Sequence, residues 1–384
     1  MFKKYNLKNL NVRIIIIVIL LCAIGFLLIR SATKDNIDYQ SMPQRQIFGI
    51  VVGMIAMTVM MLIDYNLFFK AWPVVFITSV VLLLMVRFFG NTTLGAKRWV
   101  DLPIIGRVQP SEFSKIAIIL NLAAVLNYRK KHVNSPLTWG MILALIAPQL
   151  LLIVIQPDLS TTILCTMAIL TMIYVAKLSY RIIAIALAVV VPASIWFIYS
   201  LLNGDNLFLK QYQVNRILSF VDPQKYQDKI YQQENAVMAI GSGGFWGKGL
   251  NTTSFESVKN GNYLSEAQTD FIFTIAGEEL GFVGCMIILG LFITLIIEIM
   301  ILAKNADSLG GRLICVGVAS FFTYQTFIHV AVNLWLMPNT GLPLPFVSYG
   351  LSSIISSFML LGLVLNVGLQ RKKKEKKESI FSDL

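Results

Sequence analysis

Apolar residues recur along the chain in runs of about twenty, separated by shorter polar stretches. A helical run of this length is long enough to cross the hydrocarbon core of a bilayer. Each run is expected to be helical, because lipid offers no partners for backbone N–H and C=O groups. The pattern predicts ten spans, at residues 12–30, 46–64, 69–89, 112–128, 138–156, 159–176, 181–202, 269–302, 312–336 and 342–369.

Composition excludes a soluble protein. Of the 384 residues, 56% are hydrophobic and only 14% are charged. The exterior of a soluble protein must face water, so a chain of this size does not need so much apolar surface. We therefore expect an all-α polytopic membrane protein that forms a single integral membrane domain over residues 1–384.

Basic residues set the orientation of the predicted spans. An even number of spans places both termini on one side, and the net charge of +12 is concentrated on that side. The positive-inside rule makes this side cytoplasmic. The basic residues at the two ends are Lys3, Lys4, Lys8 and Arg13 before the first span and the tail 371–384 after the last. The tail is short and adjoins the membrane, so we expect contact with membrane lipid and no nucleic-acid partner.

Two outer loops are long enough to carry function: residues 88–111, and the large extracellular loop 203–268 between the seventh and eighth spans. The second contains GSGGFWGKG, which lacks the spacing of a P-loop and of a dinucleotide-binding fingerprint. It is either a close-packed turn after a short helix or a backbone that a bulky substrate approaches closely. On the second interpretation, Gly243, Gly244 and Lys248 are candidate substrate contacts.

Cysteine and histidine give no sign of a metal centre. The four cysteines all fall within predicted spans, which predicts neither a disulfide framework nor a zinc site. His329 stands alone in the ninth span and is expected to make a packing or hydrogen-bonding contact.

Several charged residues cluster near the outer ends of the spans. Glu112 and Lys115 lie three residues apart in QPSEFSK, a spacing that permits an ion pair on one helical face. The pair is either a structural clamp or a substrate contact. Asp158 in QPDLST can cap the following helix or contribute to a site. Lys97 and Arg98 put positive charge in an outer loop, where it suits an anionic ligand such as a phosphate.

The stretch SEAQTDFIFTIAGEELGFVG places three acids near the start of the eighth span. Ser265 and Gln268 have capping-box spacing, which predicts a helix that begins near Ser265. Asp270 then lies in the second turn, reachable from outside, while Glu278 and Glu279 point elsewhere and are expected to find partners inside the bundle. A carboxylate like Asp270 can bind a cation, carry protons or act as a general base. From these residues alone, a transporter ranks before a membrane-embedded enzyme.

Six motifs occur in order around the ten predicted spans. They are GAKRW, QPSEFSK, QPDLST, AIGSGGFWGKG, TDFIFTIAGEELGFVG and TGLPLPFVSYG, at 95–99, 109–115, 156–161, 239–249, 269–284 and 340–350. Together they closely resemble the SEDS family (shape, elongation, division and sporulation), to which RodA, FtsW and SpoVE belong. The QPD motif and the GKG ending favour the RodA-like branch.

The resemblance implies functional residues. The family's essential aspartate corresponds to Asp270, its glutamate–lysine pair to Glu112 and Lys115, its loop aspartate to Asp158 and its outer-loop arginine to Arg98. Four residues depart from the family pattern: Ser265 for a proline, Gln268 for a histidine, Ser160 for a glycine and Leu351 for the second glycine of SYGG. None of these departures removes a charged residue of the implied site.

The resemblance also implies the reaction. The expected activity is a peptidoglycan glycosyltransferase that polymerises lipid II for cell-wall elongation and shape, working with a class B penicillin-binding protein. Asp270 would take the proton of the acceptor 4-hydroxyl as it attacks the donor anomeric carbon with inversion, and undecaprenyl pyrophosphate would leave. Lys97, Arg98 or a divalent cation (Mg²⁺ or Mn²⁺, with Asp270 as its candidate ligand) would steady the pyrophosphate. A lipid II flippase and a non-catalytic synthase scaffold are the alternatives. The expected location is a bacterial inner or plasma membrane, with the active site facing outward.

Overall fold

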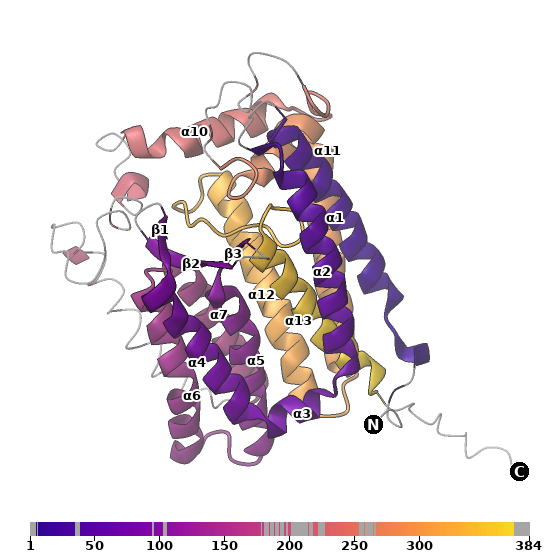
Figure 1. The fold of residues 1–384 in the computed structure, drawn as a ribbon, viewed down its shortest axis with the longest axis vertical. Coiled ribbons are helices and arrows are strands. Elements are labelled where there is room, and N and C mark those ends of the chain that lie inside the picture. Colours follow the sequence, from indigo (N-terminus) through magenta and orange to yellow (C-terminus); the bar gives the residue numbers. More distant parts are fainter. Residues whose placement is uncertain are drawn as a thin grey trace, which may run out of the picture.

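The computed structural model describes residues 7–34, 39–93, 96–102, 106–177, 227–252 and 266–371, together with Tyr5, Leu264 and a few isolated residues between 179 and 257. Within them the chain is mostly helical (Figure 1). The elements are η2 (Leu7–Asn9), α1 (Val12–Ala32), α2 (Met42–Leu62), α3 (Tyr65–Lys70), α4 (Trp72–Phe89), β1 (Asn91–Thr93), β2 (Ala96–Leu102), β3 (Gly106–Val108), α5 (Pro110–Tyr128), α6 (Pro136–Ile155), α7 (Leu159–Val175), α10 (Gln227–Ser242), α11 (Ile272–Lys304), α12 (Leu309–Asn333) and α13 (Leu351–Leu369).

Seven of the described helices are long and apolar enough to cross a membrane: α1, α2, α4, α6, α11, α12 and α13. They coincide with seven of the predicted spans, and the chain is a polytopic membrane protein. Helices α5 and α7 coincide with two further predicted spans, although α7 is shorter and α5 carries a buried ion pair. The predicted span 181–202 falls almost entirely outside the described residues.

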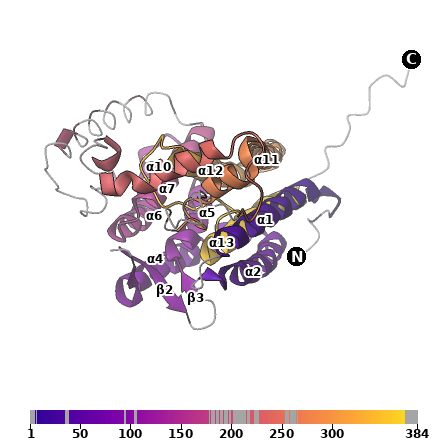
Figure 2. The same ribbon diagram turned by 90° about the horizontal axis from the view of Figure 1, so that it is seen from above.

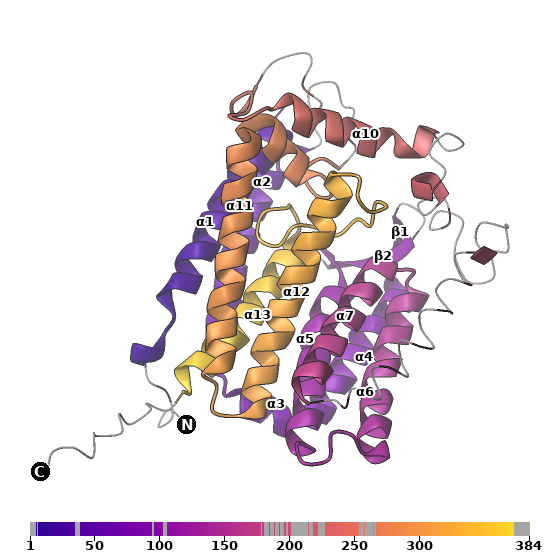
Figure 3. The same ribbon diagram turned by 180° about the vertical axis from the view of Figure 1, so that it is seen from behind.

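The long helices form a bundle with α12 and α13 at its centre (Figures 1 and 3). These two are the most buried of the spanning helices: 78% of the most apolar stretch of α12 and 89% of that of α13 are buried inside the protein. Helix α2 packs along α13, while α11 lies between α1 and α12. Seen from above, α10 runs across the end of the bundle over α12 and reaches α11 (Figure 2). That end therefore combines α10, the small β-sheet and the start of α11.

The segment between α12 and α13 differs from the prediction. Span 342–369 was expected to be helical throughout, but α13 begins only at Leu351, and residues 342–350 form irregular, mostly buried backbone. Non-helical backbone at membrane depth persists only where the protein satisfies its polar groups. Here Gln325 Nε2 donates to Pro343 O at 2.7 Å, and Gln46 Nε2 donates to Ser348 O at 3.1 Å. Polar side chains of other helices thus make this irregular segment part of the core.

A three-stranded antiparallel sheet occupies most of the loop 88–111, where no strand was predicted. Asp101 pairs with Arg107 across β2 and β3, and their side chains form an exposed ion pair of 3.5 Å. The strands are short, and their residues do not alternate in the way that reveals a half-buried sheet.

Candidate polar site at one end of the bundle

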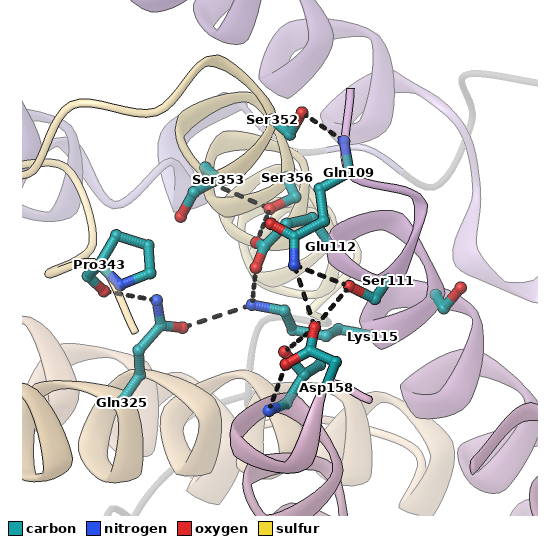
Figure 4. Close-up of polar contacts among 12 residues, drawn as sticks. Gln109, Ser111, Glu112, Lys115, Asp158, Gln325, Pro343, Ser352, Ser353 and Ser356 are labelled. Carbon is teal, nitrogen blue, oxygen red and sulfur yellow. Dashed lines mark hydrogen bonds and ion pairs between the residues drawn. The ribbon is translucent and has the colours of Figure 1, made fainter. Parts of the chain in front are cut away.

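Glu112 and Lys115 form a buried ion pair in the first turns of α5. Lys115 Nζ lies 2.7 Å from Glu112 Oε1, and each side chain is only 3% exposed. The second carboxylate oxygen accepts from Ser356 Oγ of α13 at 3.0 Å, and Lys115 also donates to Gln325 Oε1 of α12 at 3.5 Å (Figure 4). Buried charges persist when they are paired and hydrogen-bonded. The predicted ion pair is therefore present, and it joins three helices.

Asp158 lies beside this pair and caps α7. Its Oδ1 accepts from Thr161 N at 3.3 Å, which confirms the predicted capping role. Its Oδ2 also accepts from Gln109 Nε2 at 3.0 Å and Ser111 Oγ at 3.2 Å, both at the start of α5 (Figure 4). The carboxylate thus ties α7 to α5 in addition to capping its own helix.

The adjacent cations Lys97 and Arg98 have different surroundings, as expected for neighbours on the strand β2. Arg98 is 17% exposed, with Nη1 3.9 Å from Asp158 Oδ1 and Nη2 donating to Pro157 O. Lys97 is exposed. Arg98 thus fastens the sheet to the turn between α6 and α7, while Lys97 projects its charge into solvent.

Asp270 lies in a turn immediately before α11. Residues 266–271 form turns, the amide of Asp270 donates to Glu266 O at 3.1 Å, and α11 begins at Ile272. The predicted helix start near Ser265 is therefore wrong for these residues, and Ser265 itself lies outside the described part of the chain. Glu266 adopts a φ of 60°, in the left-handed region, which interrupts any right-handed helix. Asp270 remains partly exposed, as predicted.

The irregular segment before α13 holds the turn that carries Asp270. Tyr349 N donates to Gln268 O at 2.9 Å, and Ser348 Oγ donates to Thr269 O at 2.7 Å. At Pro343 the same segment accepts the hydrogen bond of Gln325, the residue that also contacts Lys115. One segment thus contacts the Asp270 turn directly and is linked to the buried ion pair through Gln325.

The glycine-rich stretch after α10 packs against a break in α11. Gly281 has φ 66° and ψ −165°, which interrupts the helix. Hydrogen bonds from the glycine-rich stretch replace those that the break removes from the helix. Lys248 N donates to Glu278 O at 2.9 Å, and Gly249 N donates to Glu279 O at 3.0 Å. In the other direction, Phe282 N donates to Gly244 O at 2.9 Å.

Gly243 of this stretch lies very close to α11. A Cβ on Gly243 would lie 2.0 Å from Gly277 O, so only glycine allows this approach. The close-packed interpretation therefore holds for Gly243, and its neighbour across the contact is α11.

Glu278 and Glu279 have partners inside the protein, as predicted. Glu278 is fully buried, and its Oε1 lies 2.9 Å from Lys248 Nζ. Glu279 Oε1 accepts from Ser31 Oγ of α1 at 2.5 Å. These two acids join α11 to the glycine-rich stretch and to α1.

His329 makes the hydrogen-bonding contact expected of it, between Nδ1 and Leu342 O at 2.8 Å. Within the described residues, no group of three or more His, Cys, Asp or Glu side chains could hold a metal ion. Several uncharged polar residues of this end were not predicted from the sequence, namely Gln109, Gln325, Asn333 and Ser356. The only available signal was their polarity within or beside apolar runs, which names no partner.

Comparison with protein families gives a match over almost the whole chain. The family model for FtsW, RodA and SpoVE, described as cell cycle protein, matches residues 12–373. The chain belongs to this family, and the predicted resemblance is confirmed.

Relatives from three branches of the family match over nearly their full lengths. Peptidoglycan glycosyltransferase MrdB of Escherichia coli K12 is 35% identical over 96% of both chains. A probable peptidoglycan glycosyltransferase FtsW of Trichlorobacter lovleyi is 32% identical, covering 95% of this chain and 94% of its own. Stage V sporulation protein E of Bacillus subtilis is also 32% identical, covering 92% of this chain and 95% of its own.

Solved structures agree on the fold. A chain from a peptidoglycan synthase complex, described for its coordination of polymerization and crosslinking, gives a TM-score of 0.76 at 27% identity, covering 95% of this chain and 99% of that chain. The rod shape determining protein RodA of Thermus thermophilus gives 0.67 at 24% identity, covering 97% and 99%. The second likeness concerns the fold alone.

Proposed function

We propose that this protein is a peptidoglycan glycosyltransferase that polymerises lipid II, with Asp270 as its reacting carboxylate. The observation that carries the proposal is the partly exposed Asp270 in a turn fixed by the core of the bundle. Relatives across nearly the whole chain bear the name of this activity. The 35% identity of this chain to MrdB also supports the RodA-like assignment and a role in cell-wall elongation and shape.

The proposed topology has ten spans with both termini in the cytoplasm of a bacterial inner or plasma membrane. Seven long helices, with α5 and α7, supply nine of these spans within the described residues, and 181–202 supplies the tenth. The start of α1 and the end of α13 lie at the end of the bundle opposite α10 (Figure 1). Because basic residues flank both, that end is assigned to the cytoplasm. Asp270, the β-sheet and the loop 203–268 then face outward.

In the proposed reaction, Asp270 takes the proton of the acceptor sugar's 4-hydroxyl. The hydroxyl oxygen forms a bond to the donor anomeric carbon on the face opposite the leaving group, so that the configuration inverts. The bond from the anomeric carbon to the phosphate oxygen breaks, and undecaprenyl pyrophosphate leaves with the electron pair. The polyprenyl tail stays in the bilayer throughout, which suits a site at the membrane boundary.

Lys97 is the cation best suited to the leaving pyrophosphate, because it is exposed on β2. Arg98 is engaged by Asp158 and Pro157, and its main contribution in this proposal is to hold the sheet in place. Gly244 is exposed and Lys248 is partly exposed, so both remain proposed substrate contacts, whereas Gly243 is buried against α11 and is no longer proposed as one. In this proposal the contribution of Glu112, Lys115 and Asp158 is structural. Their contacts hold α5, α7 and the segment before α13 in place.

A divalent cation, Mg²⁺ or Mn²⁺, remains a proposal, for which Asp270 would supply one carboxylate. The described side chains do not fit a protein-held metal centre, because they offer no cluster of three suitable ligands. No step of the proposed reaction is therefore assigned to a metal.

The proposed partner is a class B penicillin-binding protein, which would crosslink the strands. A chain of the same fold lies in a synthase complex described as coordinating polymerization with crosslinking, which supports such a pairing.

The test is synthesis of glycan strands from purified lipid II by the full-length protein and its partner in detergent. Detergent removes the bilayer, so a flippase has nothing to cross and makes no product. Strands longer than the lipid II disaccharide support the glycosyltransferase. Failure to form strands, together with lipid II transfer across vesicles by the same preparation, would establish the flippase instead.

A further inference from the structure

Asn333, near the end of α12, uses every hydrogen-bonding position of its side chain. Its Oδ1 accepts from Thr274 N at 3.0 Å and Thr274 Oγ1 at 2.7 Å. Its Nδ2 donates to Asp270 O at 3.0 Å and to His329 O at 2.8 Å. The side chain is fully buried, so these four contacts replace all of its hydration.

Two of these contacts cap α11 from another helix. The residue in the N-cap position is Phe271, which has no side-chain oxygen to accept from the first free amides of the helix. Thr274 is the third residue of α11, the position whose amide an N-cap side chain normally satisfies. Asn333 supplies the side-chain acceptor that Phe271 lacks, and the amide of Thr274 is shared between Asn333 Oδ1 and Phe271 O, each at 3.0 Å. The bond from Asn333 to His329 O, one turn earlier on α12, fixes the orientation of the amide group.

The remaining contact reaches Asp270 itself. Asn333 Nδ2 holds the carbonyl of Asp270, while the amide of Asp270 donates to Glu266 O at 3.1 Å. The backbone N–H and C=O groups of Asp270 are therefore both held by hydrogen bonds. Tyr349 and Ser348 hold the two preceding carbonyls, but Asn333 alone among these three residues also binds the first turn of α11.

We propose that Asn333 is a positioning residue for Asp270. The inference rests on the proposed role of Asp270 and extends it, because Asn333 reaches no reacting atom and acts by fixing the backbone from which the carboxylate projects. A carboxylate displaced by about 1 Å from its reactive position can lose about 100-fold in rate. Losing the asparagine should therefore slow the chemical step more than it weakens substrate binding.

The chain offers a matched control in Asn366 of α13. This asparagine is also fully buried and also caps another helix, since its Oδ1 accepts from Tyr65 N of α3 at 3.1 Å. Its Nδ2 donates to Met61 O at 2.6 Å. It lies at the end of the bundle away from Asp270, so its loss reports the structural cost of removing a buried capping amide.

The experiment measures kcat and KM for lipid II polymerisation by the full-length protein with its partner, alongside melting temperature. The variants are Asn333→Ala, Asn333→Asp, Asn366→Ala and Asp270→Asn. Asn333→Asp keeps the shape and the acceptor for Thr274 but removes the amide hydrogens that hold Asp270 O, so it decides the question if Asn333→Ala does not fold. We expect both Asn333 variants to lower kcat about 10- to 100-fold per folded molecule, with KM changed less than about threefold.

Asn366→Ala should lower the melting temperature yet keep kcat per folded molecule. The proposal is overturned if folded Asn333→Asp retains the wild-type kcat, or if Asn366→Ala loses as much kcat as the Asn333 variants. Asp270→Asn separates the two hypotheses. If it is inactive while the Asn333 variants keep kcat, only the positioning role fails; if it is fully active, the proposed function of Asp270 fails.

Discussion

Lys248 and Glu278 are joined twice: their side chains form an ion pair of 2.9 Å, and Lys248 N donates to Glu278 O, also at 2.9 Å. The pair fixes the glycine-rich stretch after α10 to α11, just before the break at Gly281. Glu278 is fully buried, whereas the side chain of Lys248 is 22% exposed. The lysine therefore supplies the positive charge that compensates the buried carboxylate. This contact connects the glycine-rich stretch after α10 to the helix that follows Asp270.

Lys248→Ala should destabilise the protein by about 3 kcal/mol, because it leaves a buried carboxylate without its cation. Thermal unfolding in detergent measures the loss. Adding Glu278→Gln to Lys248→Ala should recover part of it, since the uncompensated charge is then removed. Lys131→Ala, at an exposed lysine, should have no measurable effect. Equal stabilities of Lys248→Ala and the wild type would contradict the structural role of the pair.

The close approach of Gly243 to α11 leads to a second prediction. Gly243→Ala should destabilise the protein by about 1–3 kcal/mol, because its Cβ would meet Gly277 O at 2.0 Å and backbone must move. Gly241→Ala is the matched control two residues earlier, where a Cβ meets nothing within 4 Å. Thermal unfolding compares the two. Similar behaviour of both variants would mean that the stretch does not pack on α11 as described.

The buried pair of Glu112 and Lys115 gives a third prediction. Either Glu112→Gln or Lys115→Met alone should cost about 3–5 kcal/mol, whereas the double variant should regain much of that stability. If the pair is only a clamp, the double variant should also regain polymerisation. A stable but inactive double variant would show that one of the two charges contacts substrate.

These contacts show which features a sequence can predict for this fold. Apolar runs set the spans, and the spacing of Glu112 and Lys115 predicted their pair, because both features depend on local helical geometry. The irregular backbone of 342–350 was not predicted, because PLPFVSYG is apolar enough to continue a span. Its two prolines disfavour a helix, but the side chains that satisfy its backbone, such as Gln46 and Gln325, lie far away in the sequence. The start of α11 was misplaced for a similar reason. Its cap comes from Asn333, which is 59 residues away from Thr274.

For the candidate site, several residues were predicted from the sequence, but the contacts between them were not. Position and charge made Asp270, Asp158 and Arg98 candidates, the family resemblance then implied their roles, and the family itself is confirmed by comparison. Their connections depend on tertiary contacts that no local pattern records. Charge alone did not distinguish Lys97 from its neighbour Arg98. On the strand β2, Lys97 is exposed, whereas Arg98 contacts Asp158.

That division between the two cations supports a fourth prediction. Lys97→Ala should raise KM for lipid II about two- to fivefold with little loss of stability, as expected for one exposed charge contact. Arg98→Ala should lower the melting temperature, because it releases β2 from the turn that contains Pro157 and Asp158. Polymerisation kinetics and thermal unfolding of both variants provide the comparison. A larger KM effect from Arg98→Ala at unchanged stability would assign the pyrophosphate contact to Arg98.

The most direct test of the account is polymerisation of lipid II by the full-length protein and its partner, comparing wild type with Asp270→Asn. Asparagine keeps the shape of the side chain but cannot take the hydroxyl proton. The control is Asp101→Asn, at an exposed aspartate of the β-sheet that pairs with Arg107. The account predicts that Asp270→Asn folds and binds its partner but makes no glycan strands, whereas Asp101→Asn polymerises lipid II at the wild-type rate. Glycan strands made at the wild-type rate by Asp270→Asn would contradict it.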